Sequence, residues 1–148
     1  MVRIWNEVVD KGREFPDETR LGKLSGKKFF SSHTLTSVAV DTWDGSVVGL
    51  YVLHPNNIGR CSHICNASFA VTEELRGKHI GEKLVKDCLE KAPRYGFRVL
   101  MFNAVVKDNE HAIHLYERLG FVDMGTVPGG FRTNDGAYKD IDIFYHTL

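Results

Sequence analysis

The residues best suited to chemistry form one short turn, Arg76-Gly77-Lys78-His79-Ile80-Gly81. A run of strand-forming residues, Ile64 to Val71, precedes the turn, and apolar residues recur at helical spacing after it. Glycines at a helix start leave the backbone N–H groups uncovered, because no Cβ holds a ligand away. Those N–H groups, the positive end of the helix dipole and the charges of Arg76 and Lys78 all attract anions. The turn therefore predicts an anion site, although by itself it could also be a surface turn with two basic residues.

Periodicity and turn residues predict the elements that position this turn. Before it we expect a helix over Val2–Lys11, a second short helix within Thr19–Ser32, a hairpin of Leu35–Trp43 with Ser46–His54 around Asp44-Gly45, and a strand over Ser62–Val71. After it we expect a helix to about Ala92, a buried strand over Phe97–Val106, a helix capped by Asp108 or Asn109 and stopped by Gly120, and strands over Phe121–Val127 and Tyr138–Tyr145. This order predicts a single α/β (α+β) domain over residues 1–148. Its sheet would be mostly antiparallel, with helices on both faces and one parallel pair of strands.

Two segments together resemble the GNAT superfamily of N-acetyltransferases. The turn is similar to the family's acyl-CoA pyrophosphate motif, Gln/Arg-x-x-Gly-x-Gly/Ala: Arg76 and Gly81 match its ends, and His79 stands at the middle glycine. Downstream, Asn109 to Phe121 resembles the family segment Asn-x-x-Ala-x-x-Leu-Tyr-x-x-x-Gly-Phe. Two motifs in the right order are far more specific than either alone. The family's fold implies that the two parallel strands splay apart.

The resemblance implies acetyl-CoA as co-substrate and no metal. Its pyrophosphate would lie on the main chain of the turn, while the splayed strands would leave backbone amides free to face the pantetheine arm and the thioester. The cofactor-binding residues implied in this way are Phe69, Val71, Arg76, Gly77, Lys78, His79, Ile80, Gly81, Asn109 and Ala112.

Tyr116 occupies the family's general-acid position, where it would protonate the leaving thiolate. A phenol with a pKa of about 10 is protonated at neutral pH and lies near a thiol at about 8.5, so the transfer is nearly balanced. The alternative is a core aromatic at helical spacing. Asn109 is a helix cap, a partner of the cofactor's amide arm, or both.

The acceptor site is less well marked in the sequence. Asn66 and Asn103 lie inside apolar strands, where an unpaired amide is costly, so we expect them to face a polar cavity or to bond a neighbouring loop. A short similarity to the fungal proline-analogue acetyltransferase branch implies that both bind substrate. Pro128–Arg132 predicts a loop over the acceptor entrance, in which Arg132 binds an acceptor carboxylate or is a solvated charge. No inward carboxylate on the strands suggests a general base; histidines could relay the proton through water, or the amine could bind uncharged.

Composition restricts the class of protein. Lys+Arg and Asp+Glu both number 19 in 148 residues, which removes the net charge expected of a general nucleic-acid binder. No apolar run reaches membrane-spanning length, and three cysteines without secretory context suggest reduced thiols in the cytoplasm. Cys61, His63 and Cys65 alternate along a strand but lack a fourth metal ligand.

The sequence therefore predicts an enzyme that moves acetyl from acetyl-CoA to a small-molecule amine, amino-acid-like or polyamine-like, in a ternary complex. A peptide N-terminus or lysine is the alternative acceptor. A non-catalytic acyl-CoA-binding module is the alternative of another class.

Compared with the GNAT family, we also expect this chain to lack the β-strand that usually precedes the first helix. Leu35–Trp43 would then lie at a sheet edge with no Pro or Lys to discourage pairing, and the final strand, Asp140–His146, might add to a partner sheet in the same way. We therefore expect a homodimer, in which a second copy of the chain covers this edge.

Overall fold

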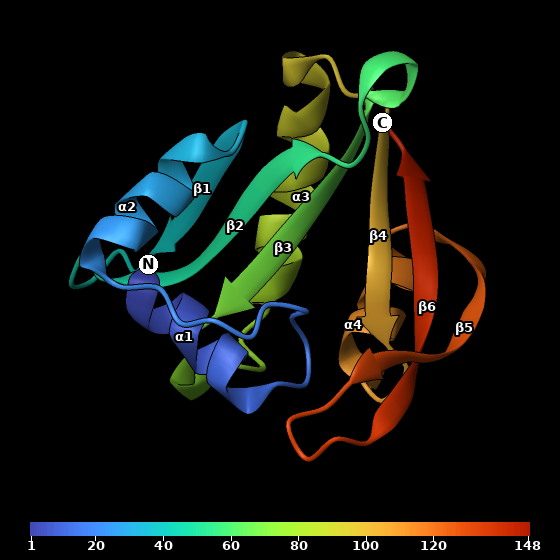
Figure 1. Cartoon of the computed structure of the whole chain (residues 1–148). Helices are drawn as coiled ribbons and strands as arrows, with labels where there is room; N and C mark the ends of the chain where they lie inside the picture. Colours follow the sequence, from blue (N-terminus) through green and yellow to red (C-terminus); the bar gives the residue numbers. More distant parts are fainter.

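A computed structural model describes residues 1–148. Four helices cover the two faces of one six-stranded sheet (Figure 1). The helices are α1 (Val2–Lys11), α2 (Lys23–Ser32), α3 (Ile80–Lys91) and α4 (Glu110–Arg118). The strands are β1 (Leu35–Val40), β2 (Val47–Pro55), β3 (Ile64–Val71), β4 (Val99–Val106), β5 (Val122–Arg132) and β6 (Tyr138–Thr147). None of the helices is long and apolar enough to cross a membrane.

The strand order is β1-β2-β3-β4-β6-β5, and only β3 and β4 run parallel. This confirms the predicted mixed, mostly antiparallel sheet with helices on both faces. Three single turns of 3-10 helix, at Gly59–Cys61, Glu73–Leu75 and Ala92–Tyr95, connect the elements. Pro93 lies in the last of these and so follows directly on the end of α3.

The core has two halves because successive side chains of a strand point to opposite faces. Leu50 and Val52 of β2 pack with Trp5 and α2 on one face. Tyr51 and Leu53 pack with α3 and the inner side of β4 on the other. Figure 1 shows α1 and α2 in front of the sheet and α3 and α4 behind it. A continuous apolar run in β2 is therefore buried on both sides.

The parallel strands β3 and β4 are hydrogen-bonded at one end only. They pair at Ile64–Val99 and Cys65–Leu100 and then separate. The N–H of Thr72 donates to Val48 on the β2 side at 2.9 Å. Because backbone groups alternate along a strand, the N–H groups of Phe69 and Val71 point the other way, into the widening space beside β4.

Two expectations for the C-terminal strands were wrong. Pro128–Arg132 is part of β5 and not a loop, because a bulge between Val127 and Phe131 absorbs the glycines. A Cβ at Gly130 would lie 2.5 Å from Ile141 Cγ1, so a glycine is needed where β5 passes β6. The loop between these strands is confined to Thr133–Ala137, and β6 lies between β4 and β5, so it is not an edge that could add to a partner sheet.

Candidate active site

A cavity of about 590 Å³ opens where β3 and β4 separate, between the starts of α3 and α4. Nine of the ten residues predicted to bind the cofactor line it; the exception is Lys78. The lining residues are Glu14, Phe69, Val71, Leu75, Arg76, Gly77, His79, Ile80, Gly81, Glu82, Val85, Asn109, His111, Ala112, Leu115, Tyr116 and Arg118. The fold thus brings together both segments that resemble the GNAT motifs.

The turn before α3 exposes its backbone to this cavity. Gly77 has φ 79°, and a Cβ at Gly77 or Gly81 would meet nothing within 4 Å, so the space over these amides is open. His79 has φ 58° and is the only non-glycine residue with positive φ, which explains why glycine suits this position. Its side chain is 76% exposed and lies 3.5 Å from Glu82, so His79 contributes its backbone at the cavity.

Tyr116 projects from α4 into an aromatic cluster at the wall of the same cavity. Its ring centroid lies 4.5 Å from that of Phe102 and 5.4 Å from that of Phe121. Burial raises the pKa of the Tyr116 hydroxyl, and the negative charge of Glu14 raises it further. The phenol is therefore protonated at neutral pH, as a proton donor must be. Asn109 caps α4, because its Oδ1 accepts from the N–H of Ala112 at 3.3 Å.

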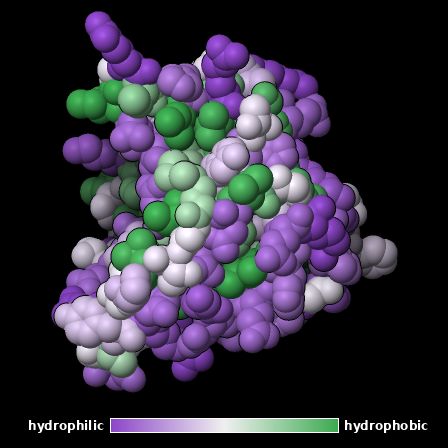
Figure 2. Space-filling model, turned by 90° about the vertical axis from the view of Figure 1, so that its right-hand side faces the viewer, coloured by the Kyte–Doolittle hydropathy of each residue, from purple (hydrophilic) through white to green (hydrophobic).

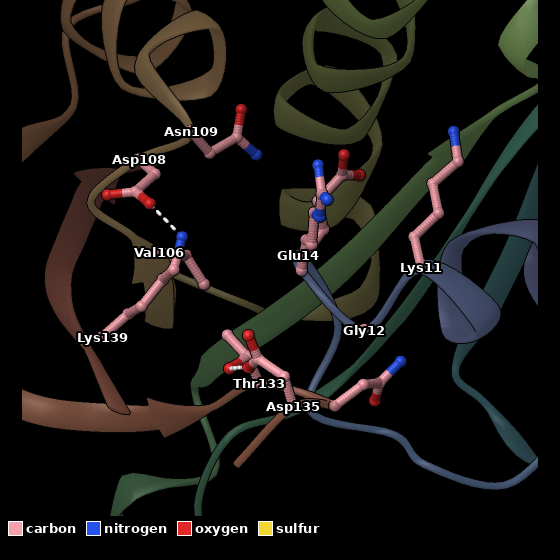
Figure 3. A pocket seen from close by; sticks show the side chains of 11 residues that line it. Lys11, Gly12, Glu14, Val106, Asp108, Asn109, Thr133, Asp135 and Lys139 are labelled. Carbon is pink, nitrogen blue, oxygen red and sulfur yellow. Dashed lines mark hydrogen bonds and ion pairs between the residues drawn. The ribbon is translucent and has the colours of Figure 1, made fainter. Parts of the chain in front are cut away.

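A second, strongly polar cleft of about 570 Å³ adjoins the first cavity. It is lined by Lys11, Gly12, Arg13, Glu14, Val106, Asp108, Asn109, Thr133, Asn134, Asp135 and Lys139, of which only Val106 is apolar (Figure 3). Glu14 and Asn109 line both spaces. Lys139 pairs with Asp108 on one wall, and a hydrogen bond from Thr133 helps to lower the pKa of Asp135.

Sequence reasoning missed this cleft and Glu14 in particular. The cleft is assembled from the segment after α1, the end of β4 and the loop between β5 and β6, which are distant in sequence. The guanidinium of Arg76 donates to both carboxylate oxygens of Glu14, at 3.0 and 3.3 Å, across 62 positions of sequence. No local pattern around Glu14 signals this contact.

The three predicted substrate-binding residues line neither cavity. Asn103 exchanges two hydrogen bonds with Asn56, at 3.2 and 2.5 Å, so it bonds a neighbouring loop, one of the two expected arrangements. Asn66 lies opposite His54 in the β2–β3 ladder. The Arg132 side chain pairs with Glu18 at 2.6 Å. The structure gathers no group of three or more side chains suited to hold a metal ion.

Comparison with known proteins gives the class of this fold and site. The model of the acetyltransferase (GNAT) family matches residues 4–121. The N-acetyltransferase aca1 of Schizosaccharomyces pombe is 33% identical over 95% of this chain and 76% of its own length. A solved GCN5-related N-acetyltransferase from Kribbella flavida superposes with a TM-score of 0.89 at 32% identity, covering 100% of this chain and 90% of the other.

A further solved structure shares the fold at lower identity. The GNAT superfamily phosphinothricin acetyltransferase of Sinorhizobium meliloti, in complex with acetyl-CoA, has a TM-score of 0.90 at 23% identity, over 99% of this chain and 80% of the other. Together with the family match, these relatives show that the chain belongs to the GNAT family and is an acyltransferase.

Proposed function

We propose that this enzyme transfers acetyl from acetyl-CoA to the amine of a small molecule, by direct attack in a ternary complex. The observation that carries the proposal is that the cavity and the polar cleft share two lining residues, Glu14 and Asn109. The cavity exposes the backbone amides at the start of α3, and the cleft is lined almost entirely by polar residues. Two substrates that enter from separate spaces can meet without a covalent enzyme intermediate.

The cavity between the starts of α3 and α4, here the cofactor cavity, has the chemistry that acetyl-CoA requires. A diphosphate would be held by the amides from Gly77 to Gly81 and by Arg76, where the dipole of α3 adds positive potential. The N–H groups of Phe69 and Val71 would face the thioester carbonyl and donate to the oxyanion as it forms. The complex of the Sinorhizobium meliloti relative with acetyl-CoA supports this choice of donor.

Tyr116 would then give its proton to the sulfur of the departing CoA. Burial raises its pKa, so the hydroxyl stays protonated but is a weaker acid than a free phenol, and the aromatic cluster holds its ring in place. Proton transfer of this kind contributes about 10²–10⁴ in rate.

The polar cleft would hold the acceptor. It carries both signs of charge, and Arg13 in its wall forms no ion pair within the protein. A small amine that also bears a carboxylate is complementary to such walls. Phosphinothricin, after which the Sinorhizobium meliloti acetyltransferase is named, belongs to this class, which favours an amino-acid-like acceptor over a polyamine.

The test is release of free CoA thiol from acetyl-CoA in the presence of the twenty amino acids, spermidine or a short peptide, each supplied separately. We expect turnover with one or more amino-acid-like amines and a mass increase of one acetyl group on that amine. Turnover with the peptide alone would support the alternative acceptor. Binding of acetyl-CoA without turnover of any amine would support the non-catalytic alternative.

A further inference from the structure

Glu14 occupies the one place where the cofactor cavity, the polar cleft and the proposed acid meet. It lines both spaces, together with Asn109. Tyr116, the proposed acid, lines the same cofactor cavity as Glu14. Figure 3 shows Glu14 and Asn109 reaching into the cleft from opposite sides. A carboxylate placed here can accept a proton from an acceptor amine. In this structure, the Arg76 guanidinium donates hydrogen bonds to both of its oxygens.

Arg76 also belongs to the cofactor cavity, so two anions compete for one guanidinium. Its ion pair with Glu14 is partly exposed, at 44% and 27% of the two side chains, and water therefore weakens it. A diphosphate bound to the amides before α3 carries more negative charge than the Glu14 carboxylate, and the dipole of α3 also favours an anion there. The diphosphate would take Arg76 from Glu14.

We propose that Glu14 is the carboxylate that binds the acceptor's ammonium group and accepts its proton, and that Arg76 keeps it occupied until acetyl-CoA binds. Both parts rest on the proposed function: the exchange at Arg76 needs acetyl-CoA as the donor, and the acceptor role needs the acceptor in the polar cleft. Acetyl-CoA binding thereby prepares the acceptor site, and the affinities of the two substrates are coupled.

The proton steps balance in this arrangement. Glu14 takes one proton from the ammonium group, and the neutral amine attacks the thioester carbon. The C–N bond forms, the C–S bond breaks with its electron pair going to sulfur, and Tyr116 protonates that sulfur. The phenolate takes back a proton from the cationic nitrogen of the new amide, and Glu14 returns its own proton to solvent.

Of the cations that line the two spaces, only Arg76 forms an ion pair with Glu14. Lys11, in the cleft wall, pairs with Glu73 at 2.7 Å. Arg13 lines the cleft but not the cofactor cavity, and His111 lines the cofactor cavity but not the cleft. Arg76 is thus the cation that lines the cofactor cavity and holds Glu14.

Calorimetric titration of acetyl-CoA into four proteins tests the exchange: the wild type, Glu14→Gln, Arg76→Gln and the double variant. We expect Arg76→Gln to weaken binding at least about tenfold. Glu14→Gln should tighten it about two- to fivefold, since a partly exposed ion pair no longer competes. In the Arg76→Gln background, Glu14→Gln should leave the affinity for acetyl-CoA unchanged. An equal effect of Glu14→Gln with and without Arg76, or no effect in either, overturns the exchange.

Steady-state kinetics with the amine found by thiol release tests the acceptor role. We expect Glu14→Gln to lower kcat by about 10²–10⁴ and Glu14→Asp to restore part of it. Glu74→Gln is the matched control, because it removes an exposed carboxylate two residues from Arg76 that lines neither space; its kcat should be unchanged. A kcat of Glu14→Gln within about threefold of wild type overturns the role of Glu14 as proton acceptor.

The two measurements separate the possible failures. If no amine is turned over, the proposed function and the acceptor role fail together, while the binding cycle still decides whether Glu14 and the diphosphate compete for Arg76.

Discussion

Tyr116, the predicted proton donor, lies in the wall of the cofactor cavity. Its ring packs on Phe102 and Phe121, and burial raises its pKa. Tyr116→Phe removes only the hydroxyl, so the aromatic cluster and the affinity for acetyl-CoA should be kept while kcat falls by about 10²–10⁴. Steady-state kinetics measures kcat, and calorimetry measures the affinity for acetyl-CoA. Full turnover in a folded variant would mean that Tyr116 is only a core aromatic.

Gly81 tests the cofactor site with a variant and its control. A Cβ at Gly81 meets nothing within 4 Å, so Gly81→Ala should fold and bind acetyl-CoA within a few-fold of wild type. Gly81→Asp should also fold, because an acidic residue in the first turn of a helix is favourable. Its charge should nevertheless weaken acetyl-CoA binding by about tenfold or more. Equal affinity of the two variants by calorimetry would contradict the placement of the diphosphate.

At the scale of the elements, Gly49 of β2 sets how closely α3 approaches the sheet. A Cβ there would lie 3.0 Å from Leu84 Cδ1 and 3.1 Å from Ile80 Cγ2. Gly49→Val should therefore destabilise the fold by about 1–3 kcal/mol, and Gly49→Ala by less. Because Ile80 lines the cofactor cavity, Gly49→Val should also weaken acetyl-CoA binding. Urea unfolding and calorimetry check both effects; unchanged stability would mean that α3 has room to shift.

Further along the same face of α3, a polar network fixes this helix to the sheet. The hydroxyl of Tyr51 donates to Asp87 at 2.9 Å, and Lys91 pairs with the same carboxylate at 2.9 Å. Burial alone would raise the pKa of Asp87, but the hydrogen bonds from Lys91 and Tyr51 outweigh it and lower that pKa. Tyr51→Phe should cost about 1–2 kcal/mol and lower Tm by roughly 2–8 °C.

The same network predicts a dependence of stability on pH. A lowered folded-state pKa stabilises the protein above the unfolded pKa of about 3.9, and this contribution is lost as pH falls through the folded value. The stability difference between wild type and Tyr51→Phe should therefore shrink below about pH 4. Thermal melts at several pH values measure it; a difference that is constant down to pH 3 would contradict the role of Asp87.

At the scale of the whole molecule, the sheet has two free edges. The prediction that the first hairpin strand lies at an edge is confirmed, since β1 ends the strand order, with Val38 and Val40 exposed at 40% and 49%. The other edge, β5, exposes Val122, Met124 and Val127. Figure 2 shows the right-hand side of the molecule, where apolar patches lie among polar residues.

A homodimer joined along β1 is still a prediction, and both edges allow a test. Light scattering at micromolar concentration should give twice the monomer mass. Val40→Lys should convert the dimer to monomer, since a charged edge opposes strand pairing. Met124→Lys, at the other edge, is the control and should leave the dimer intact. A monomer mass for the wild-type protein would mean that the edge of β1 needs no partner.

Features that depend on neighbouring residues could be predicted from the sequence. The alternation and length of apolar runs predicted each strand, Asn109 and Gly120 predicted the ends of α4, and the glycine turn predicted the open amides before α3. The GNAT motifs could be recognised for the same reason: each is a short run of consecutive residues, and binding by the main chain needs no distant partner. The prediction failed at Pro128–Arg132, where local glycines suggest a loop but pairing with β6 keeps the segment in a strand.

Contacts between residues that are distant in sequence could not be predicted and are seen only in the folded chain. The contact of Glu14 with Arg76, the polar cleft built from three segments, and the place of β6 inside the sheet all come from chain packing. The physical reason is that ion pairs and clefts depend on positions in space, and burial of two apolar sheet faces fixes those positions. A lone carboxylate such as Glu14 carries no periodicity that could reveal its partner.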